Sequence, residues 1–415
     1  MTTVAEGIED DLQLAALEAL NCQAGQGYYF SRPVDSDTIA GLLHTADPER
    51  TELAHARTAA RTTGGLYVVE AHRGRAALDR VGADLDELHA ELSVPINARR
   101  AWLDTWAMTH EPYEPWVIVV RRRGRSGIDG AALLAATTDE SGLVVVGMGH
   151  GCSGVTALPA RAGAEQALAD AIIVTMTSLS QPWSLHLEQI AAGDPVAAAI
   201  AAGLDGARLH QDRRVPRVAL TWGEELRGYL SRNTHRSLKK AHNRLERDGH
   251  VVTMAFDRDP GAVASLLGDI ERVHRQRDHD LHRVSDLDNP AELDFWRRVI
   301  LLHTMRGEVE IATLRIDGSL AAYVVSLLDG SSYRVYDGPF DTDFAHLAPG
   351  RLLESAALER ALADPSYTEL DWWSGLSAEK LLTENVSFPR EWLSASATPA
   401  TVHAAATADH LGSDG

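Results

Sequence analysis

The chain has 415 residues, more than one hydrophobic core usually organises, so two or three domains are expected. Apolar residues make up 45% and charged residues 24%, a balance typical of globular proteins that excludes a largely disordered chain. The formal net charge of −20 argues against a general nucleic-acid binder, because polyanions are attracted to positive surfaces.

Targeting signals and metal-binding patterns are absent from the sequence. The N-terminus MTTVAEGIEDDLQ has neither the basic start nor the apolar run of a secretory signal, and no apolar stretch is long enough to span a bilayer. We therefore expect a cytoplasmic protein. Cys22 and Cys152 lack metal-site spacing, and the segment HRQRDHDLHR places only some of its histidines on one helix face. The sequence thus predicts no disulfide framework and no metal, with each cysteine a small buried apolar residue.

The first predicted elements, in residues 1–46, are a strand end, an amphipathic helix, a turn and a second helix. The motif AEGIE ends the strand, and QGYYFSRP follows the first helix. The segment resembles the C-terminal end of an EAL-type cyclic-dinucleotide phosphodiesterase domain. This resemblance implies that Glu6 lies beside a metal centre and that Gln26 and Gly27 line the mouth of the site. A barrel collects its metal ligands from several strand ends, so this remnant predicts no phosphodiesterase activity, and its apolar helix would need a partner surface, such as a protein.

The main body repeats one order of elements. After a predicted helical linker at 47–65, the order helix, hairpin, strand, glycine loop, helix, strand occurs twice. It starts at ARRAWLDTWAM in the first half and at ELDFWRRVILLH in the second. Such a pattern predicts an α/β (α+β) fold with two mixed-sheet lobes at 66–220 and 221–394, and a disordered tail at 395–415. The first lobe, whose loop GHGCSG has no Pro-Gly-Arg equivalent, is expected to be a scaffold.

The strand-loop-helix at residues 333–363 is the strongest local signal for a ligand. Its Ala-Pro-Gly-Arg turn leads into a helix whose first amides and dipole would favour an anion such as a pyrophosphate. The alternative is an ordinary loop in which proline merely starts the helix. The residues predicted to bind the cofactor here are Leu347, Pro349, Gly350, Arg351 and Leu352.

Several further motifs carry a resemblance to a family. They are the basic helix SRNTHRSLKKAHNRLERDG, the HRQR helix end, the strand GSLAAY, the loop-helix HLAPGRLL and the late strand LDWWSG. Together, residues 86–393 resemble the CelD-type acetyltransferases of the GNAT superfamily and are more distantly similar to Fem-type transferases, which take amino acids from aminoacyl-tRNA. The resemblance implies tandem GNAT-like lobes, with acyl-CoA, chiefly acetyl-CoA, bound by the second. The family has a Tyr-Lys pair after the late strand, and here only Lys380 is kept, behind Glu379.

Direct acyl transfer from a thioester needs a proton acceptor for the amine and a proton donor for the leaving thiolate. On the two strands expected to part around the acyl group, Tyr333 or Tyr336 could protonate the thiolate. Asp337 or Asp371 could accept the amine proton, directly or through water. For each, a structural role stays open: packing for the tyrosines, and a turn before Gly338 for Asp337.

The helix at 227–247 is strongly basic within an acidic chain. Four cations recur at every fourth residue and form a stripe, Arg232, Arg236, Lys240 and Arg244. The stripe is either a solvated face or a binding surface for an anion. The candidate anions are the phosphates of coenzyme A, an acidic glycan and a tRNA backbone.

These observations lead to one main hypothesis and two alternatives. The sequence predicts a GNAT-type N-acyltransferase that moves an acyl group from acyl-CoA to an amine or hydroxyl acceptor, a small molecule or a glycan, held between the lobes. An aminoacyl-tRNA donor is the second hypothesis. The third is a non-catalytic adaptor in which the EAL remnant and the basic helix bind partners.

Overall fold

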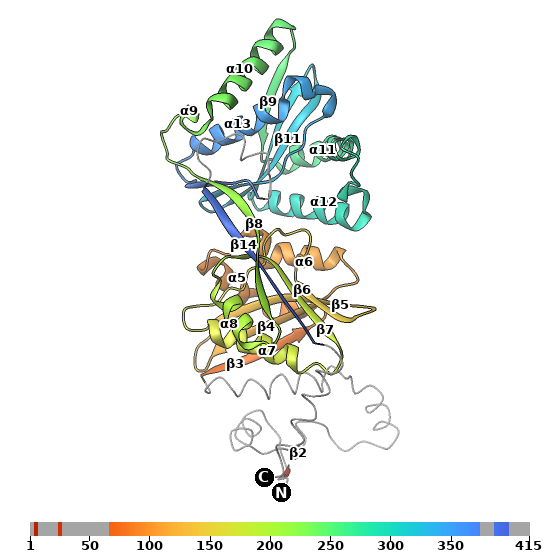
Figure 1. Ribbon diagram of the computed structural model, residues 1–415, viewed down its shortest axis with the longest axis vertical. Coiled ribbons are helices and arrows are strands. Elements are labelled where there is room, and N and C mark those ends of the chain that lie inside the picture. The colour runs from red at the N-terminus through yellow and green to blue at the C-terminus, as the bar shows by residue number, and fades with distance from the viewer. Residues whose placement is uncertain (1–3, 7–23, 27–65, 374–385, 398–415) are drawn as a thin grey trace. The chain divides into compact units, whose positions relative to one another are not determined.

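The computed structural model describes residues 4–6, 24–26, 66–373 and 386–397 (Figure 1), and the chain divides into two compact units, 1–55 and 56–415. In the first unit, β1 (Val4–Glu6) and β2 (Ala24–Gln26) pair in parallel, with Glu6 opposite Gln26. A strand at the AEGIE motif was predicted. The predicted helices of this segment, Gly27 and the predicted linker lie outside the described residues.

The first lobe surrounds its central strands with helices on both faces. In chain order it contains β3 (Tyr67–Arg73), α4 (Ala77–Arg80), α5 (Gly82–Glu91), a 3-10 helix η2 (Ile96–Ala98), α6 (Arg100–Thr109), β4 (Glu114–Arg122), β5 (Gly130–Asp139), β6 (Gly142–Gly147), α7 (Glu165–Thr177), β7 (Trp183–Ala191), α8 (Pro195–Gly203) and β8 (Arg208–Ala219). Side chains of β4 alternate between two cores: Val117 belongs to the core that contains Trp102 of α6, and Ile118 to the core that contains Leu168 of α7. This alternation is the strand period of two, buried on both sides.

The second lobe repeats the same order of elements. It contains α9 (Leu226–Tyr229), α10 (Arg232–Arg247), β9 (Val252–Asp257), α11 (Pro260–Asp280), 3-10 helix η3 (Asp286–Asp288), α12 (Pro290–Met305), β10 (Val309–Ile316), β11 (Ser319–Asp329), β12 (Ser332–Asp337), 3-10 helix η4 (Thr342–Leu347), α13 (Pro349–Leu362), β13 (Glu369–Asp371) and β14 (Val386–Ala397). Local sequence explains where α11 and α12 begin. The side chains of Asp259 and Asn289 accept backbone hydrogen bonds at the two N-caps, and a proline follows each cap.

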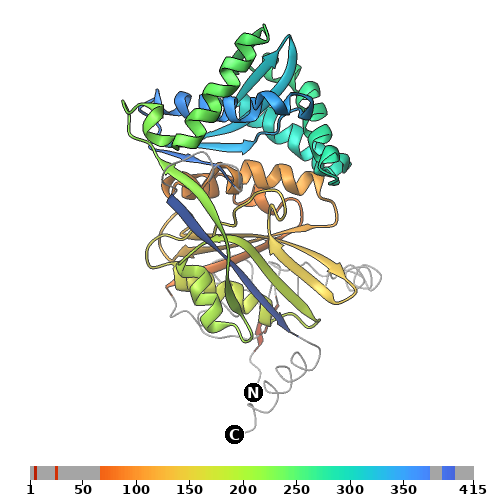
Figure 2. The same cartoon turned by 45° about the horizontal axis from the view of Figure 1, so that its top comes forward.

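Two long strands join the lobes. Twelve strands form one continuous sheet in the order β3-β4-β5-β6-β7-β14-β8-β13-β12-β11-β10-β9 (Figure 2). Strand β14, at the C-terminal end, pairs with β7 of the first lobe and with β8, while β8 also pairs with β13 of the second lobe. β14 extends to Ala397, so the start of the predicted tail at residue 395 needs correction: Leu393 and Ala395 are buried in the core of the first lobe.

The lobes also share a hydrophobic core. Trp102 of α6 contacts Phe295 of α12 edge to face, with ring centroids 5.7 Å apart, and both side chains are almost completely buried. The predicted mixed α/β fold is confirmed. No helix within the described ranges is long and apolar enough to cross a membrane.

Candidate functional site

Strands β12 and β13 pair over only three residues. The pairs run from Ser332 opposite Glu369 to Arg334 opposite Asp371, after which β12 continues alone to Asp337. Among the described residues beyond that last pair, β12 is hydrogen-bonded to β11 and to no other strand, across a bulge. The two strands thus part after Arg334 and Asp371; that an acyl group lies between them stays a prediction.

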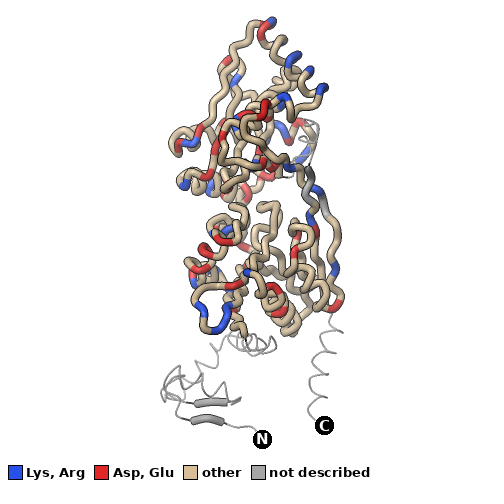
Figure 3. Tube along the Cα trace, turned by 90° about the vertical axis from the view of Figure 1, so that its left-hand side faces the viewer, with Lys and Arg blue, Asp and Glu red and all other residues tan. Residues whose placement is uncertain are grey.

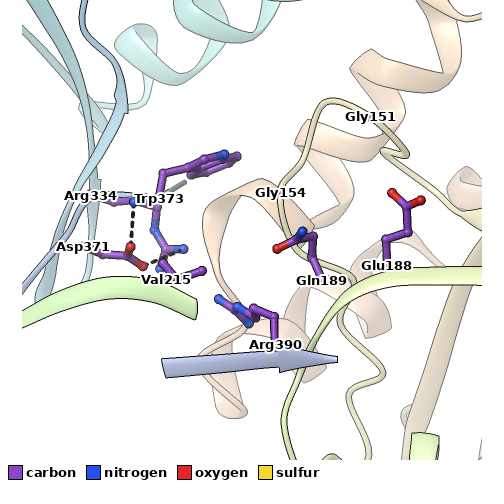
Figure 4. A pocket seen from close by; sticks show the side chains of 9 residues that line it. All are labelled: Gly151, Gly154, Glu188, Gln189, Val215, Arg334, Asp371, Trp373 and Arg390. Atoms are coloured by element: carbon purple, nitrogen blue, oxygen red, sulfur yellow. Dashed lines mark hydrogen bonds and ion pairs between the residues drawn. The ribbon is translucent and has the colours of Figure 1, made fainter. Parts of the chain in front are cut away.

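A pocket of about 220 Å³ lies beside this opening, between the lobes (Figure 4). Both lobes and both joining strands line it, through Gly151, Gly154, Glu188, Gln189, Val215, Arg334, Asp371, Trp373 and Arg390. It holds the last paired residues of β12 and β13 together with the glycine loop of the first lobe. The structure thus has a pocket between the lobes, and binding of an acceptor there stays a prediction.

Asp371 holds the wall of this pocket together. Its Oδ1 accepts the backbone N–H of Trp373 at 2.8 Å, and its Oδ2 pairs with Arg217 Nε at 3.1 Å and with Arg334 Nη1 at 3.4 Å. The side chain is 1% exposed. Both oxygens are already engaged, so a proton-accepting role for Asp371 would require at least one of these contacts to break.

Trp373 bends the chain sharply at the end of this wall. Its φ of 56° is in the left-handed region, which is uncommon for a bulky residue. Its indole packs against Gly154 so closely that a Cβ on that glycine would lie 2.5 Å from the ring. The loop GHGCSG of the first lobe therefore packs against a residue of the second; the scaffold role expected for the first lobe stays a prediction.

Arg390 is the pocket residue that sequence reasoning missed most completely. It is 5% exposed, and in the part of the chain that the structure describes no carboxylate lies within ion-pair distance of it. Burial, followed by repulsion from Arg217, lowers the pKa of Arg390 to about 10. A basic residue within the strand sequence FPREWLS was the available signal.

Tyr336 and Asp337 lie at the opening, in different surroundings. The ring of Tyr336 contacts the indoles of Trp102 and Trp373, each with centroids 5.2 Å apart. Burial is the main cause that raises the pKa of Tyr336 well above its ordinary value, and the nearby Cys152 and Asp337 add to it. Its hydroxyl therefore stays protonated near neutral pH.

A hydrogen-bonded network holds Asp337. Its Oδ2 accepts from the hydroxyl of Tyr323 at 2.7 Å and lies 3.2 Å from Nδ1 of His274, whose Nε2 is 3.3 Å from Asp278. Burial opposes the charged imidazole, but the attraction of Asp337 outweighs it, so the pKa of His274 is raised. The same pairing outweighs the effect of burial on the carboxylate and lowers the pKa of Asp337. Sequence reasoning considered His274 only as a metal ligand.

Tyr333 points away from the pocket. Its hydroxyl donates to Glu310 Oε1 at 2.8 Å, in a core formed with residues of α13. Burial, together with the charge of Glu310, raises the pKa of Tyr333. Tyr333 and the pocket residue Arg334 are consecutive on β12, so they illustrate the alternation of faces along a strand. Lys380 lies outside the described residues.

The predicted cofactor residues form the start of α13. Ala348 at the N-cap has φ 53° and no side chain that could cap the first amides, while Leu347, Pro349 and Gly350 are buried. A Cβ on Gly350 would meet Phe340 at 2.8 Å, so this glycine makes room for an aromatic ring. Gly350 could therefore contact a ligand only through its backbone amide, and Arg351 could offer its amide in the same way. Leu352 packs against a core.

The basic stripe of α10 reaches the same place. We call Arg232, Arg236, Lys240 and Arg244 the α10 stripe; all four are exposed, and the helix carries Lys and Arg along its length (Figure 3). Arg244 donates to the backbone oxygen of His346 in η4, and Arg351 of α13 donates to Ser237 of α10 at 2.9 Å. No acidic partner is found for the other three cations among the described residues. The stripe and the first turn of α13 are thus adjacent.

One group of polar residues was not anticipated from the sequence. Cys152 donates to Glu292 Oε2 at 3.1 Å, and His110 Nε2 is 3.1 Å from the other oxygen. Their polar atoms all lie within 4.8 Å, close enough for a metal ion, although hydrogen bonds account for the arrangement. Burial and then the charge of Glu292 raise the pKa of Cys152. Cys152 is half-buried and polar in its contacts, not the purely apolar residue that was expected.

Comparisons with known proteins agree with this geometry. Residues 232–381, within the second lobe, match the family described as acetyltransferase (GNAT) domain. No curated protein gives a match. The crystal structure of FemX is similar with a TM-score of 0.53 at 11% identity, over 74% of this chain and 95% of that one.

Two further solved structures are similar with lower TM-scores. A conserved protein of unknown function from Bacteroides thetaiotaomicron VPI-5482 has a TM-score of 0.48 at 12% identity, over 75% of this chain and 96% of that one. A tandem GNAT protein from the clavulanic acid biosynthesis pathway has a TM-score of 0.42 at 15% identity, over 80% of this chain and 99% of that one. Residues 232–381 are thus similar to a GNAT-type acetyltransferase domain, and the likeness to FemX shows the fold.

Proposed function

We propose that the protein transfers an acyl group, chiefly acetyl, from acyl-CoA to an amine or hydroxyl acceptor held in the pocket between the lobes. The observation that carries the proposal is the parting of β12 and β13 after Arg334 and Asp371. This parting creates an opening between the two strands. The first turn of α13, which has no side-chain cap, follows β12 closely in the sequence, and the pocket is lined by Arg334 and Asp371. Such an opening lets a thioester pass between two strands and meet an acceptor.

The donor half of the site combines two features that favour anions. First-turn amides of α13 and the helix dipole suit the diphosphate of coenzyme A. The α10 stripe, joined to that turn through Arg244 and His346, adds exposed positive charge for further phosphates. This explains a basic surface on a chain whose net charge is −20.

In the reaction, the acceptor nitrogen or oxygen attacks the thioester carbonyl carbon, and the carbon–sulfur bond breaks. The thiolate takes a proton, which we assign to Tyr336, because the hydroxyl of Tyr333 already donates to Glu310; the raised pKa of Tyr336 keeps its hydroxyl protonated. The acceptor loses a proton, which we assign to Asp337 acting with His274. Asp371 is better suited to positioning, since both of its oxygens are engaged.

A second function is favoured by one observation. The unpaired cations of the α10 stripe would also suit a tRNA backbone, and the resemblance to Fem-type transferases implies an aminoacyl-tRNA donor for the same fold. In this case, the donor ester would occupy the same opening. An adaptor role for residues 1–46, with Glu6, Gln26 and Gly27 as relics of a phosphodiesterase site, stays a separate hypothesis.

Calorimetric titration of the full chain with acetyl-CoA tests the proposal. Micromolar binding is expected, with at least tenfold weaker binding in Arg351→Glu, because the new carboxylate lies at the proposed diphosphate position. Arg351→Gln is the matched control, since it loses the same bond to Ser237 without adding negative charge. Binding of charged tRNA in place of acetyl-CoA would select the second function, and binding of neither would leave the proposal without support.

A further inference from the structure

The pocket between the lobes contains more positive than negative charge. Three guanidinium groups lie in or beside it, those of Arg217, Arg334 and Arg390. Arg217 lies 3.6 Å from Glu369 and 3.1 Å from Asp371. Asp371 also forms an ion pair with Arg334. Both of these carboxylates are therefore engaged by Arg217 and Arg334, and neither lies within ion-pair distance of Arg390.

Neighbouring acids do not correct this imbalance. Asp329, 3.5 Å from Arg334, is already bound by Arg99 at 2.7 Å. Glu188, across the pocket on β7, lies 3.5 Å from His150 and is largely open to solvent. Arg390 remains the buried cation without a counter-charge in the part of the chain that is described.

Arg390 also faces the pocket. It belongs to β14, where it pairs with Ala191 of β7, and its guanidinium points from that strand toward the side formed by Val215 and Asp371 (Figure 4). A buried charge is unfavourable unless it is paired, and a guanidinium offers a planar fork of donors that matches a carboxylate. A strand position with an unpaired, inward-facing arginine is therefore a feature that a bound anion would explain and that packing alone would not.

We propose that Arg390 binds a carboxylate group of the acceptor, so that the acceptor class is a small amine carrying a carboxylate, such as an amino acid. One uncompensated positive charge matches one carboxylate better than a dianionic phosphate. Glu188 and Gln189, on the opposite side of the pocket, offer oxygen atoms toward the ammonium form of such a molecule. A pocket of about 220 Å³ suits a ligand of this size better than a polymer end. The term acceptor rests on the proposed function; the carboxylate site itself does not.

The test compares wild type with Arg390→Met by thermal melting of the full chain, using glycine, acetate and inorganic phosphate as probes at constant ionic strength, with chloride as the reference. Glycine and acetate are expected to raise the melting temperature of the wild type in a saturable way. In Arg390→Met, their affinity should fall at least tenfold. The melting temperature without ligand should be unchanged or higher, because an unpaired buried charge has been removed.

Three results would overturn the proposal. One is an Arg390→Met protein that retains wild-type affinity for glycine and acetate or, should that variant melt well below wild type without ligand, an Arg390→Gln protein that retains it. The second is a wild type whose response to acetate equals its response to chloride. The third is stabilisation by phosphate alone, which would make the site a phosphate site.

Failure of the proposed function gives a different pattern. Acetyl-CoA binding is expected to survive in Arg390→Met, since the donor half lies at α13. A protein that binds glycine through Arg390 but never binds acetyl-CoA would keep the carboxylate site and lose the acyl-CoA reaction. Arg351→Gln should bind glycine as the wild type does and serves as the control on the donor side.

Discussion

The contact between Gly154 and Trp373 predicts that a side chain at position 154 destabilises the protein, and this loss of stability can be measured. Gly154 has φ +59°, and a Cβ there would lie 2.5 Å from the Trp373 indole. Gly151, in the same loop, has φ +78° but no atom within 4 Å of its added Cβ. The two glycines therefore share the backbone strain and differ in the steric conflict.

The expected magnitudes follow from these two terms. A left-handed conformation costs an alanine about 1–2 kcal/mol, which is the whole effect expected for Gly151→Ala. Overpacking against a rigid ring adds about 1–3 kcal/mol, so Gly154→Ala should lose about 2–5 kcal/mol of the free energy of unfolding. The conflict also displaces Trp373, so ligand binding in the pocket should weaken in Gly154→Ala and not in Gly151→Ala.

Urea denaturation followed by circular dichroism gives both stabilities. A double-mutant cycle with Trp373→Ala isolates the contact, and a coupling of about 1–3 kcal/mol is expected because the added methyl no longer meets the ring. The reasoning would be refuted if Gly151→Ala and Gly154→Ala lost equal free energies of unfolding and showed no coupling to Trp373. The Trp373 indole would then not pack against this loop.

Four further predictions concern the site. Folding raises the pKa of His274, so this residue stabilises the protein fully at a pH below its unfolded-state pKa, and the stabilisation is lost as the pH rises through its folded-state pKa. Asp337→Asn should reduce this pH dependence of the free energy of unfolding, measured by urea titration at several pH values. Tyr336→Phe should reduce the turnover rate with little change in acetyl-CoA affinity, measured by thiol release and calorimetry. Replacing the α10 stripe by glutamine should weaken binding of the anionic donor and flatten its salt dependence, whereas an unchanged slope would make the stripe a solvated face. Gly350→Ala should lose about 1–3 kcal/mol of unfolding free energy by steric conflict with Phe340, and Phe340→Leu should restore part of it.

Local sequence predicted most elements of the two lobes. Short apolar runs identified strands such as β4 and β11, and glycine and proline marked several turns, because these signals depend on residues close in the chain. The opening at β12 and β13 was predicted by the repeated order of elements together with the resemblance. Short elements such as α4 were not predicted, since one helical turn has too few residues to show a period.

The pocket could not be predicted in the same way. Arg217, Arg334 and Arg390 come together because β14 inserts between β7 and β8, a pairing between residues far apart in the chain. What the sequence does show is an arginine within each of the strands β8, β12 and β14, and a buried arginine is costly and therefore informative. The hydrogen bonds of Cys152 belong to the same class, since His110 and Glu292 lie in different lobes.

The division of residues between the lobes bears on how such a protein could change its substrate. In the proposed site, the donor half is built by α13 and α10 of the second lobe alone, whereas the acceptor pocket takes Gly154 and Gln189 from the first lobe and Arg334 from the second. Substitutions among the first-lobe residues of the pocket would therefore alter which acceptor binds while leaving the donor amides in place, and Arg390 on the shared strand β14 would keep the carboxylate requirement common to every such acceptor.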